Sequence, residues 1–212
     1  MTAANPIPSL NPWFPPAPAG TPAPKPLRAI GLVGIDRIGT GIAHWCATRG
    51  LGVILYDAES AALTQAVGVV RENFNAAEQR GEITHDAAHK AVGGIGITTC
   101  VEDMEFCDMV IETVVEDAAS KRARFAEFSR VLPPEIVLAT CASGPGIEEL
   151  AAAIKSPGRL IGLGFFLPVH TAAQVQVTLG TQTARLTAER VLHFVSVLGK
   201  QPVVQGPPRS QP

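Results

Sequence analysis

Short apolar runs alternate with segments of helical period through most of this 212-residue chain. Seven runs have the length and composition of strands: 29–34, 52–56, 95–98, 109–114, 136–139, 160–164 and 201–205. Apolar residues three and four positions apart predict the helices between them, which begin near 38 and 84 or cover 63–74, 118–130, 146–154 and 184–198. Strands that alternate with helices form a mostly parallel sheet covered on both faces. The pattern therefore predicts an α/β fold with a doubly wound sheet.

The two ends of the chain differ from this pattern. Residues 1–27 hold nine of the 18 prolines, and proline removes backbone donors and favours extended conformations. We expect a Pro-rich disordered tail there, with docking of Trp13 and Phe14 on the protein's own surface or on a partner's aromatic groove as the alternative. Residues 206–212 are expected to be a frayed C-terminus. One domain over 28–205 remains.

The composition argues against two classes of partner. Lys and Arg (17) nearly balance Asp and Glu (19), so there is no excess positive charge for a nucleic acid backbone. No run approaches the roughly 18 apolar residues of a membrane-spanning helix, and the N-terminus lacks the apolar core of a signal peptide. We therefore expect a cytoplasmic protein with neither nucleic acid nor membrane as partner.

Metal binding is not indicated by the cysteines or histidines. The four cysteines lack the C-x-x-C spacing of zinc sites, so we expect reduced thiols. His85 and His89 have the i, i+4 spacing that could clamp a metal, but no third ligand stands near them in sequence. A solvated helix face is the simpler interpretation.

A glycine-spaced turn joins the first predicted strand to the first predicted helix. It reads Gly34-Ile35-Asp36-Arg37-Ile38-Gly39, and in a doubly wound sheet the N–H groups of such a turn hold the pyrophosphate of a dinucleotide. Asp57 ends the second strand, 23 residues after Gly34, where a carboxylate accepts hydrogen bonds from the adenosine ribose and repels a 2′-phosphate. The turn and Asp57 predict a Rossmann-type site for NAD rather than NADP.

Asp36 departs from the nucleotide-binding pattern, because its position is normally a glycine that lets the backbone approach the diphosphate. Two unit charges about 4 Å apart repel by about 4 kcal/mol at an effective dielectric of about 20, which weakens binding roughly a thousandfold if nothing compensates. Arg37 could compensate, or Asp36 could turn outward and pair with Arg37. Weakened NAD binding and an empty shell both remain open.

Further segments extend the match beyond the glycine turn. They are Gly39–Ala43, Arg80–Thr84, Asp108–Glu112, Ile136–Thr140, Ile161–Leu163 and Leu198–Lys200. With these segments in this order, the chain from about Arg28 to Gln205 resembles the NAD-binding domain of the L-3-hydroxyacyl-CoA dehydrogenases, a family that includes 3-hydroxybutyryl-CoA dehydrogenases.

The resemblance implies hydride exchange between nicotinamide and C3 of an acyl-CoA, with a glutamate-held histidine as acid/base and a serine at the substrate oxygen. The family's cofactor-side glutamate and lysine match Glu116 and Lys121, and its serine matches Ser143. Gly164 occupies the histidine position, and Gln176 stands 12 residues on, in place of the glutamate. Glycine cannot move a proton, and losing a general base removes roughly 10²- to 10⁴-fold of rate. These matches predict little or no catalysis.

Three more residues bear on this prediction. The resemblance places Cys141 and Leu167 where the family has asparagines. Cys141 could be a reactive thiol of lowered pKa or an ordinary buried one. His170, six residues past Gly164, could rescue the lost histidine or could be an exposed histidine without that role.

The family also has a helical domain after the nucleotide domain, which closes the substrate cleft and dimerises, and the present sequence ends before it. We therefore expect half of the acyl-CoA site to be missing. The resulting hypothesis is a degenerate NAD(H)-binding domain protein with little or no dehydrogenase activity and acyl-CoA as a candidate ligand. One alternative is a working 3-hydroxyacyl-CoA oxidoreductase of fatty acid or hydroxybutyrate metabolism, completed by a partner chain or by His170 and Ser143, with a homo-oligomer or an active homologue as candidate partners. The other is a regulatory or scaffold partner of an active homologue.

Overall fold

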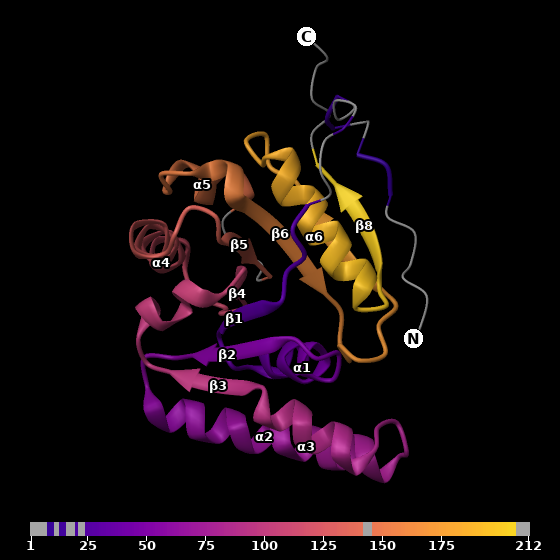
Figure 1. Ribbon diagram of the computed structural model, residues 1–212. Helices are drawn as coiled ribbons and strands as arrows, with labels where there is room; N and C mark the ends of the chain where they lie inside the picture. The colour runs from indigo at the N-terminus through magenta and orange to yellow at the C-terminus, as the bar shows by residue number, and fades with distance from the viewer. Residues whose placement is uncertain (1–7, 11–12, 16–19, 21–23, 142–145, 207–212) are drawn as a thin grey trace.

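The computed structural model describes residues 8–10, 13–15, 20, 24–141 and 146–206. An eight-stranded sheet runs through the molecule in the order β3-β2-β1-β4-β5-β6-β7-β8, with helices on both faces (Figure 1). Its strands are β1 (Ala29–Val33), β2 (Gly52–Tyr56), β3 (Ile95–Thr98), β4 (Met109–Glu112), β5 (Val137–Thr140), β6 (Leu160–Phe165), β7 (Gln174–Thr178) and β8 (Gln201–Gln205). Its helices are α1 (Arg37–Ala47), α2 (Ser60–Gln79), α3 (His85–Gly93), α4 (Ala118–Val131), α5 (Ile147–Ala152) and α6 (Arg185–Val197), with 3-10 turns η1 (Val101–Phe106) and η2 (Pro157–Arg159).

The sheet is parallel except where β7 pairs antiparallel with β6. The prediction of a mostly parallel, doubly wound sheet is confirmed. The sequence analysis did not include β7 or η1. Residues 174–178 read Gln-Val-Gln-Val-Thr, and this period-two alternation is the signal that could have identified β7.

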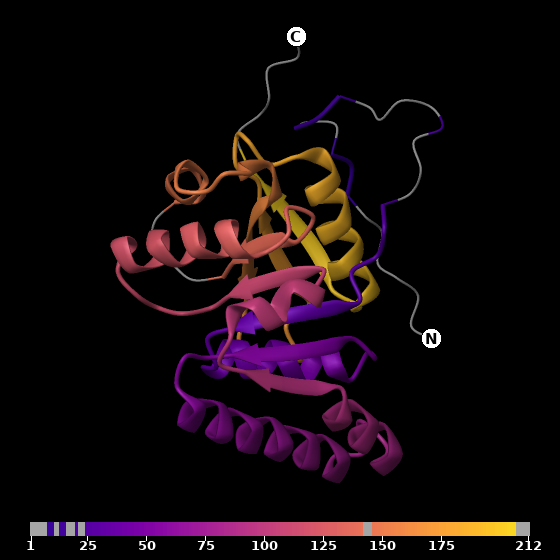
Figure 2. The same cartoon turned by 60° about the vertical axis from the view of Figure 1, so that its left-hand side comes forward.

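Two layers of helices bury the two faces of the sheet. On β4, Met109 and Ile111 pack into a core with α1, α2 and α6, whereas Val110 packs into a second core with α4 and α5. Figure 2 shows α4 and α5 on one side of the sheet and α6 on the other. Successive strand residues point to opposite faces, so strands covered on both sides are mostly apolar, and β4 and β5 have a polar residue only at their last position, Glu112 and Thr140.

The four adjacent strands β2, β1, β4 and β5 end level with one another at their carboxyl edge. Val33 of β1 pairs with Tyr56 of β2 and with Glu112 of β4, and Glu112 pairs with Thr140 of β5. The residues that follow these strands therefore meet at one edge. The sheet changes winding direction between β1 and β4, and ligands of such sheets bind at the carboxyl edge at that point.

The N-terminal segment differs from the expectation of an unattached tail wherever it is described. Leu10, Phe14 and Leu27 are buried in the core that contains α6. Trp13 Nε1 donates a hydrogen bond to the Gly206 carbonyl at 3.2 Å, and Arg185 of α6 donates to the Pro15 carbonyl. Apolar burial and these bonds hold the described part of the segment against α6 and the end of β8, although its prolines predicted a disordered tail.

β8 occupies the residues predicted for the last strand. Gly206, which was expected to belong to the frayed end, accepts the hydrogen bond of Trp13, and the rest of that end, 207–212, lies outside the described residues. No described helix is both long and apolar enough to cross a membrane.

Candidate functional site

The glycine turn lies at the carboxyl edge of the sheet, and Asp36 is the N-cap of α1. Its carboxylate Oδ1 accepts hydrogen bonds from the backbone N–H of Ile38 at 3.1 Å and of Gly39 at 2.9 Å. Thr113, which follows β4, donates its hydroxyl to the Gly34 carbonyl at 3.0 Å. The N–H groups at the start of α1 therefore already hold an anion, supplied by the chain itself.

Both remaining glycines of the turn are required by its backbone. Gly34 has φ +94°, in the left-handed region, and a Cβ there would lie 2.6 Å from Thr113 Oγ1. A Cβ on Gly39 would lie 2.1 Å from the Gly34 carbonyl oxygen. This close approach of helix and strand is the role of the outer glycines in dinucleotide-binding turns, so the backbone of the turn is kept although its middle glycine is not.

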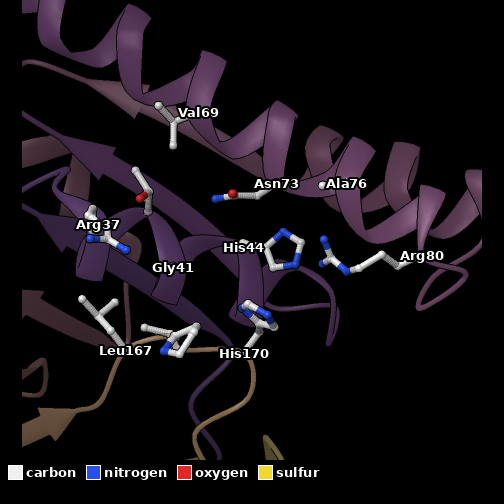
Figure 3. Close-up of a pocket in the computed structure, with 12 residues that line it drawn as sticks. Arg37, Gly41, His44, Val69, Asn73, Ala76, Arg80, Leu167 and His170 are labelled. Carbon is white, nitrogen blue, oxygen red and sulfur yellow. The ribbon is translucent and has the colours of Figure 1, made fainter.

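Arg37 does not neutralise Asp36 by pairing with it. Among the described residues no ion pair joins the two side chains. Arg37 is exposed and instead lines a cavity beside α1 (Figure 3). The expected outward turn of Asp36 to pair with Arg37 is therefore not found, whereas compensation by Arg37 for the charge that a diphosphate would meet stays a prediction.

Asp57 lies directly after β2, level with Gly34 after β1. Its carboxylate Oδ1 accepts the backbone N–H of Glu59 at 2.9 Å and the residue is half-buried. The position at the end of the second strand is that of a ribose-binding carboxylate.

NAD therefore fits one half of this site and not the other. Asp57 suits the adenosine ribose, but the Asp36 carboxylate occupies the N–H groups of Ile38 and Gly39 that would hold the diphosphate. A diphosphate that enters must displace this carboxylate and tolerate its charge. As the turn stands, its residues do not fit the diphosphate.

A buried ion pair lies next to the turn. Lys121 on α4 and Glu112 on β4 have no exposed side-chain surface, and the Lys121 ammonium lies 2.9 Å from Glu112 Oε2. The ammonium also donates to the Val114 carbonyl at 2.8 Å, and Thr140 donates its hydroxyl to Glu112 at 2.9 Å. Glu112 was not predicted as the partner of Lys121. The signal for it in the sequence is a lone carboxylate at the end of the otherwise apolar strand β4.

Glu116 and Lys121, matched together by the resemblance, have different partners. Glu116 accepts a two-pronged interaction from Arg124, with distances of 3.1 and 3.0 Å. Lys121 is turned into the protein toward Glu112. The structure thus gives both residues local ionic partners.

Gly164 and Gln176 lie directly opposite one another. They are register partners in the antiparallel pair β6–β7, and a Cβ on Gly164 would lie 3.0 Å from the Gln176 Cβ. The Gln176 amide donates to Gln205 Oε1 on β8 at 3.0 Å. The two positions matched to the acid/base pair are therefore adjacent, and neither residue there can take up a proton near neutral pH.

The remaining sequence candidates at this edge are Ser143 and Cys141. Ser143 lies outside the described residues. Burial raises the pKa of the Cys141 thiol well above its usual range, and the charges of Glu112 and Asp36 raise it further. A thiolate is the reactive form, so the raised pKa favours the ordinary thiol over the reactive one.

His170 lies in a different place from Gln176. It is exposed and lines a cavity of about 290 Å³ together with His44 of α1 (Figure 3). No hydrogen bond joins His170 to Gln176 among the described residues. The sequence analysis did not single out His44, although Arg37, Gly41 and His44 follow one face of α1 at helical spacing.

His85 and His89 lie together on α3, with ring centroids 6.3 Å apart. A carboxylate of α2 lies beside this pair, with Glu78 Oε1 3.1 Å from His85 Nδ1. No cluster of three or more His, Cys, Asp or Glu suited to a metal ion occurs in the described part of the chain.

Comparison with known proteins agrees with this architecture. Residues 29–207 match the family model of the 3-hydroxyacyl-CoA dehydrogenase NAD-binding domain. The chain is 35% identical over 178 residues to a 3-hydroxybutyryl-CoA dehydrogenase of Bradyrhizobium diazoefficiens, covering 84% of this chain and 61% of the relative. It is 33% identical over 177 residues to a 3-hydroxyadipyl-CoA dehydrogenase of Escherichia coli, covering 84% of this chain but only 37% of that protein.

Solved structures show the same likeness. The crystal structure of Mycobacterium tuberculosis FadB2 superposes with a TM-score of 0.83 at 34% identity, covering 88% of this chain and 66% of that one. A 3-hydroxybutyryl-CoA dehydrogenase structure from Escherichia coli gives 0.83 at 32% identity, covering 86% of this chain and 39% of that one. The chain thus spans less than two thirds of the length of the curated relatives compared here.

Proposed function

Because the chain belongs to the 3-hydroxyacyl-CoA dehydrogenase family through the NAD-binding domain, we propose that it is a degenerate NAD(H)-binding domain with weakened NAD binding and little or no dehydrogenase activity. The observation that carries this proposal is the Gly164–Gln176 register pair. The position that would supply the acid/base imidazole has no side chain, and its cross-strand neighbour is a neutral amide bound to Gln205. A hydride transfer to or from a carbonyl carbon needs a proton donor or acceptor at the oxygen.

Asp36 supports the second part of the proposal. Its carboxylate caps α1 through the N–H groups that would bind the diphosphate, and no ion pair with Arg37 offsets its charge in the described residues. Loss of these N–H donors and repulsion of the diphosphate both weaken NAD binding. NAD affinity is therefore reduced even though Asp57 suits the ribose.

The residues that differ from the family pattern at positions 36, 164 and 176 leave the scaffold intact. Gly34 and Gly39 keep the tight contact between β1 and α1, and the buried pair Glu112–Lys121 holds α4 against β4. Loss of function at a few side chains costs a fold little when the residues that pack and hydrogen bond are kept. The chain keeps the architecture of a nucleotide domain without the groups for proton transfer.

The test is a turnover assay on the full chain with acetoacetyl-CoA and NADH. The expected result is no acetoacetyl-CoA-dependent NADH oxidation at ordinary enzyme rates, which are about 1 to 10³ per second. The Bradyrhizobium relative serves as the positive control under the same conditions. Turnover at such rates would overturn the proposal.

A His170→Ala variant makes any observed turnover interpretable. If the wild-type chain turns over and the variant does not, His170 acts as the missing acid/base and the proposal fails at Gly164. If both turn over equally, another group supplies the proton and the proposal fails as well.

A further inference from the structure

A groove of about 520 Å³ lies at the amino edge of the sheet, at the other end of β1 from the glycine turn. Its lining includes residues that precede three strands: Lys25 before β1, Asp108 before β4 and Ile136 before β5. Phe106 at the end of η1 and Leu186 at the start of α6 also line it. As described, it shares no lining residue with the cavity beside α1, so it is a separate feature of the surface.

Two large apolar side chains of this groove are exposed to solvent. Phe106 is 78% exposed, the largest value for a large apolar residue in the described chain, and Leu186 is 57% exposed. Single exposed apolar residues are ordinary, whereas large ones that gather at one groove mark an interaction surface. Because a phenylalanine buries roughly 150–250 Å² when it is covered, a partner that covers Phe106 gains much of its apolar contact there.

The walls of the groove are held by hydrogen bonds within the chain. Arg159, which is only 6% exposed, donates to the Pro133 carbonyl at 2.6 Å. Arg190 of α6 donates to the Glu135 carbonyl at 2.9 Å. These bonds fix the turn between α4 and β5 against η2 and α6. A surface that is already ordered loses little conformational freedom on binding, which favours association.

The charges around the groove balance one another. The described lining residues include three basic and three acidic side chains, which are Lys25, Arg159 and Arg190, and Glu105, Asp108 and Glu135. A partner with one strong sign of charge, such as a nucleic acid or an anionic membrane, meets like charges on this surface. Across a twofold axis, by contrast, each residue faces a different residue of the other copy, so opposite charges can meet. The charge balance therefore favours a second copy of this chain.

Charges of both signs are free to pair with another copy. Glu105 and Glu135 are exposed, and no ion pair includes their carboxylates among the described residues. The Lys25 side chain is 79% exposed, and its ammonium lies 3.7 Å from Asp108. Asp108 has other partners, because the Arg190 guanidinium lies 3.6 Å away and two backbone N–H groups donate to its carboxylate at 2.8 and 3.1 Å. Lys25 can therefore turn to a carboxylate of another copy without leaving Asp108 unpaired.

From these observations we infer that the amino-edge groove is an interface between two copies of this chain, related by a twofold axis. Phe106 and Leu186 of each copy cover the groove of the other. Lys25 of each copy faces Glu105 and Glu135 of the other. The groove has 13 described lining residues, against roughly 20–30 residues a side in a standard interface, so the dimer is expected to be weak, with a dissociation constant of about 1 to 100 µM. Neither NAD nor hydride transfer enters this inference, and it stands or falls separately from the proposed function.

The test is sedimentation velocity of the full chain at concentrations from about 1 to 500 µM, which bracket the expected dissociation constant. A reversible monomer–dimer equilibrium is expected, and Phe106→Ala is expected to weaken it about tenfold or more. Ile97→Ala, at a position of β3 that is 53% exposed and outside the groove, is the matched control and is expected to dimerise as the wild type does. If Phe106→Ala fails to fold, Leu186→Ala takes its place. A chain that stays monomeric throughout, or a dimer that the groove variant leaves unchanged or that Ile97→Ala weakens equally, overturns the inference.

A charge exchange tests the twofold arrangement. Lys25→Glu alone, and the double variant Glu105→Lys with Glu135→Lys alone, each place like charges opposite one another, so each is expected to dimerise severalfold more weakly than the wild type. In a mixture of the two proteins, opposite charges face one another at both contacts of a mixed dimer. The mixture is therefore expected to dimerise more tightly than either protein alone. A mixture that associates no better than its two components contradicts the inference, because a change in the fold of either variant would not be corrected by mixing.

Discussion

Lys121 illustrates at the scale of one residue how a charge is kept inside the protein. Its ammonium and the Glu112 carboxylate are both fully buried and 2.9 Å apart, and Thr140 and the Val114 carbonyl complete their hydrogen bonds. Lys121→Met leaves the Glu112 carboxylate buried without a counter-ion, which is expected to cost about 3 to 5 kcal/mol in the free energy of unfolding. Urea unfolding followed by circular dichroism measures it.

The matched control is Arg124→Met, which breaks the partly exposed pair with Glu116. Because solvent screens that pair, its loss is expected to cost no more than about 1 kcal/mol. An equal loss of stability in the two variants would mean that burial does not decide the cost.

His44 gives a prediction on acid stability. Its pKa in the folded protein is lowered to about 4, with burial as the largest cause, against about 6.5 in the unfolded chain. The unfolded state therefore binds a proton first, and stability is full above pH 6.5 and is lost as pH falls toward 4. Between pH 7 and pH 5, His44 alone should account for about 2 kcal/mol. His44→Gln should flatten the decline by that amount in urea unfolding at the two pH values, and parallel curves would contradict this.

At the same scale, the sequence located the anomaly at Asp36 but not its geometry. Residue spacing could not decide whether the Asp36 carboxylate repels a diphosphate or turns outward to pair with Arg37, because the outcome depends on which N–H groups the carboxylate reaches. Those groups become available only when α1 starts at Arg37, with Asp36 as its N-cap. Likewise, the place of His170 at the cavity that His44 also lines depends on a loop path that no local pattern specifies.

At the scale of elements, the strands and helices with strong periodicity were predicted with small errors at their ends. β7 was missed because its Gln and Thr residues interrupt the apolar run by which most of the other strands were identified. The N-terminal segment was judged by its prolines, whereas Leu10 and Phe14 are buried in the core and Trp13 and Pro15 are hydrogen bonded to residues more than 150 positions away. Local composition cannot report such contacts.

The docking of this segment can be measured through Phe14. Phe14 is buried in the core that contains α6, and a buried phenylalanine changed to alanine costs about 3 to 5 kcal/mol in well-packed cores. Phe14→Ala should therefore lower the free energy of unfolding by at least about 2 kcal/mol. Phe106→Ala, at a position 78% exposed, is the control and should stay within about 0.5 kcal/mol of the wild type.

An undocked segment would give a different outcome. Phe14→Ala would then match Phe106→Ala in stability, and proteolysis would remove the first 24 residues without changing the urea midpoint.

At the scale of the whole molecule, the scaffold of a nucleotide domain is kept, whereas residues at three positions that would act on a ligand differ from the family pattern. The level carboxyl edges of β1, β2, β4 and β5, the tight glycine contacts and the buried ion pair form a nucleotide domain. At the positions that act on a ligand, the chain has Asp36, Gly164 and Gln176. Under the proposed function, the first reduces NAD affinity and the other two remove proton transfer, so the two expected losses are independent and can be measured separately.

The most direct measurement is a calorimetric titration of NADH into the wild type, Asp36→Asn and Asp36→Gly. Asp36→Asn removes the charge but keeps an oxygen that can cap α1, whereas Asp36→Gly frees both N–H groups. The account predicts the tightest binding for Asp36→Gly, roughly 10²- to 10³-fold above the wild type, with Asp36→Asn between them. Equal NADH affinity in all three proteins would contradict it.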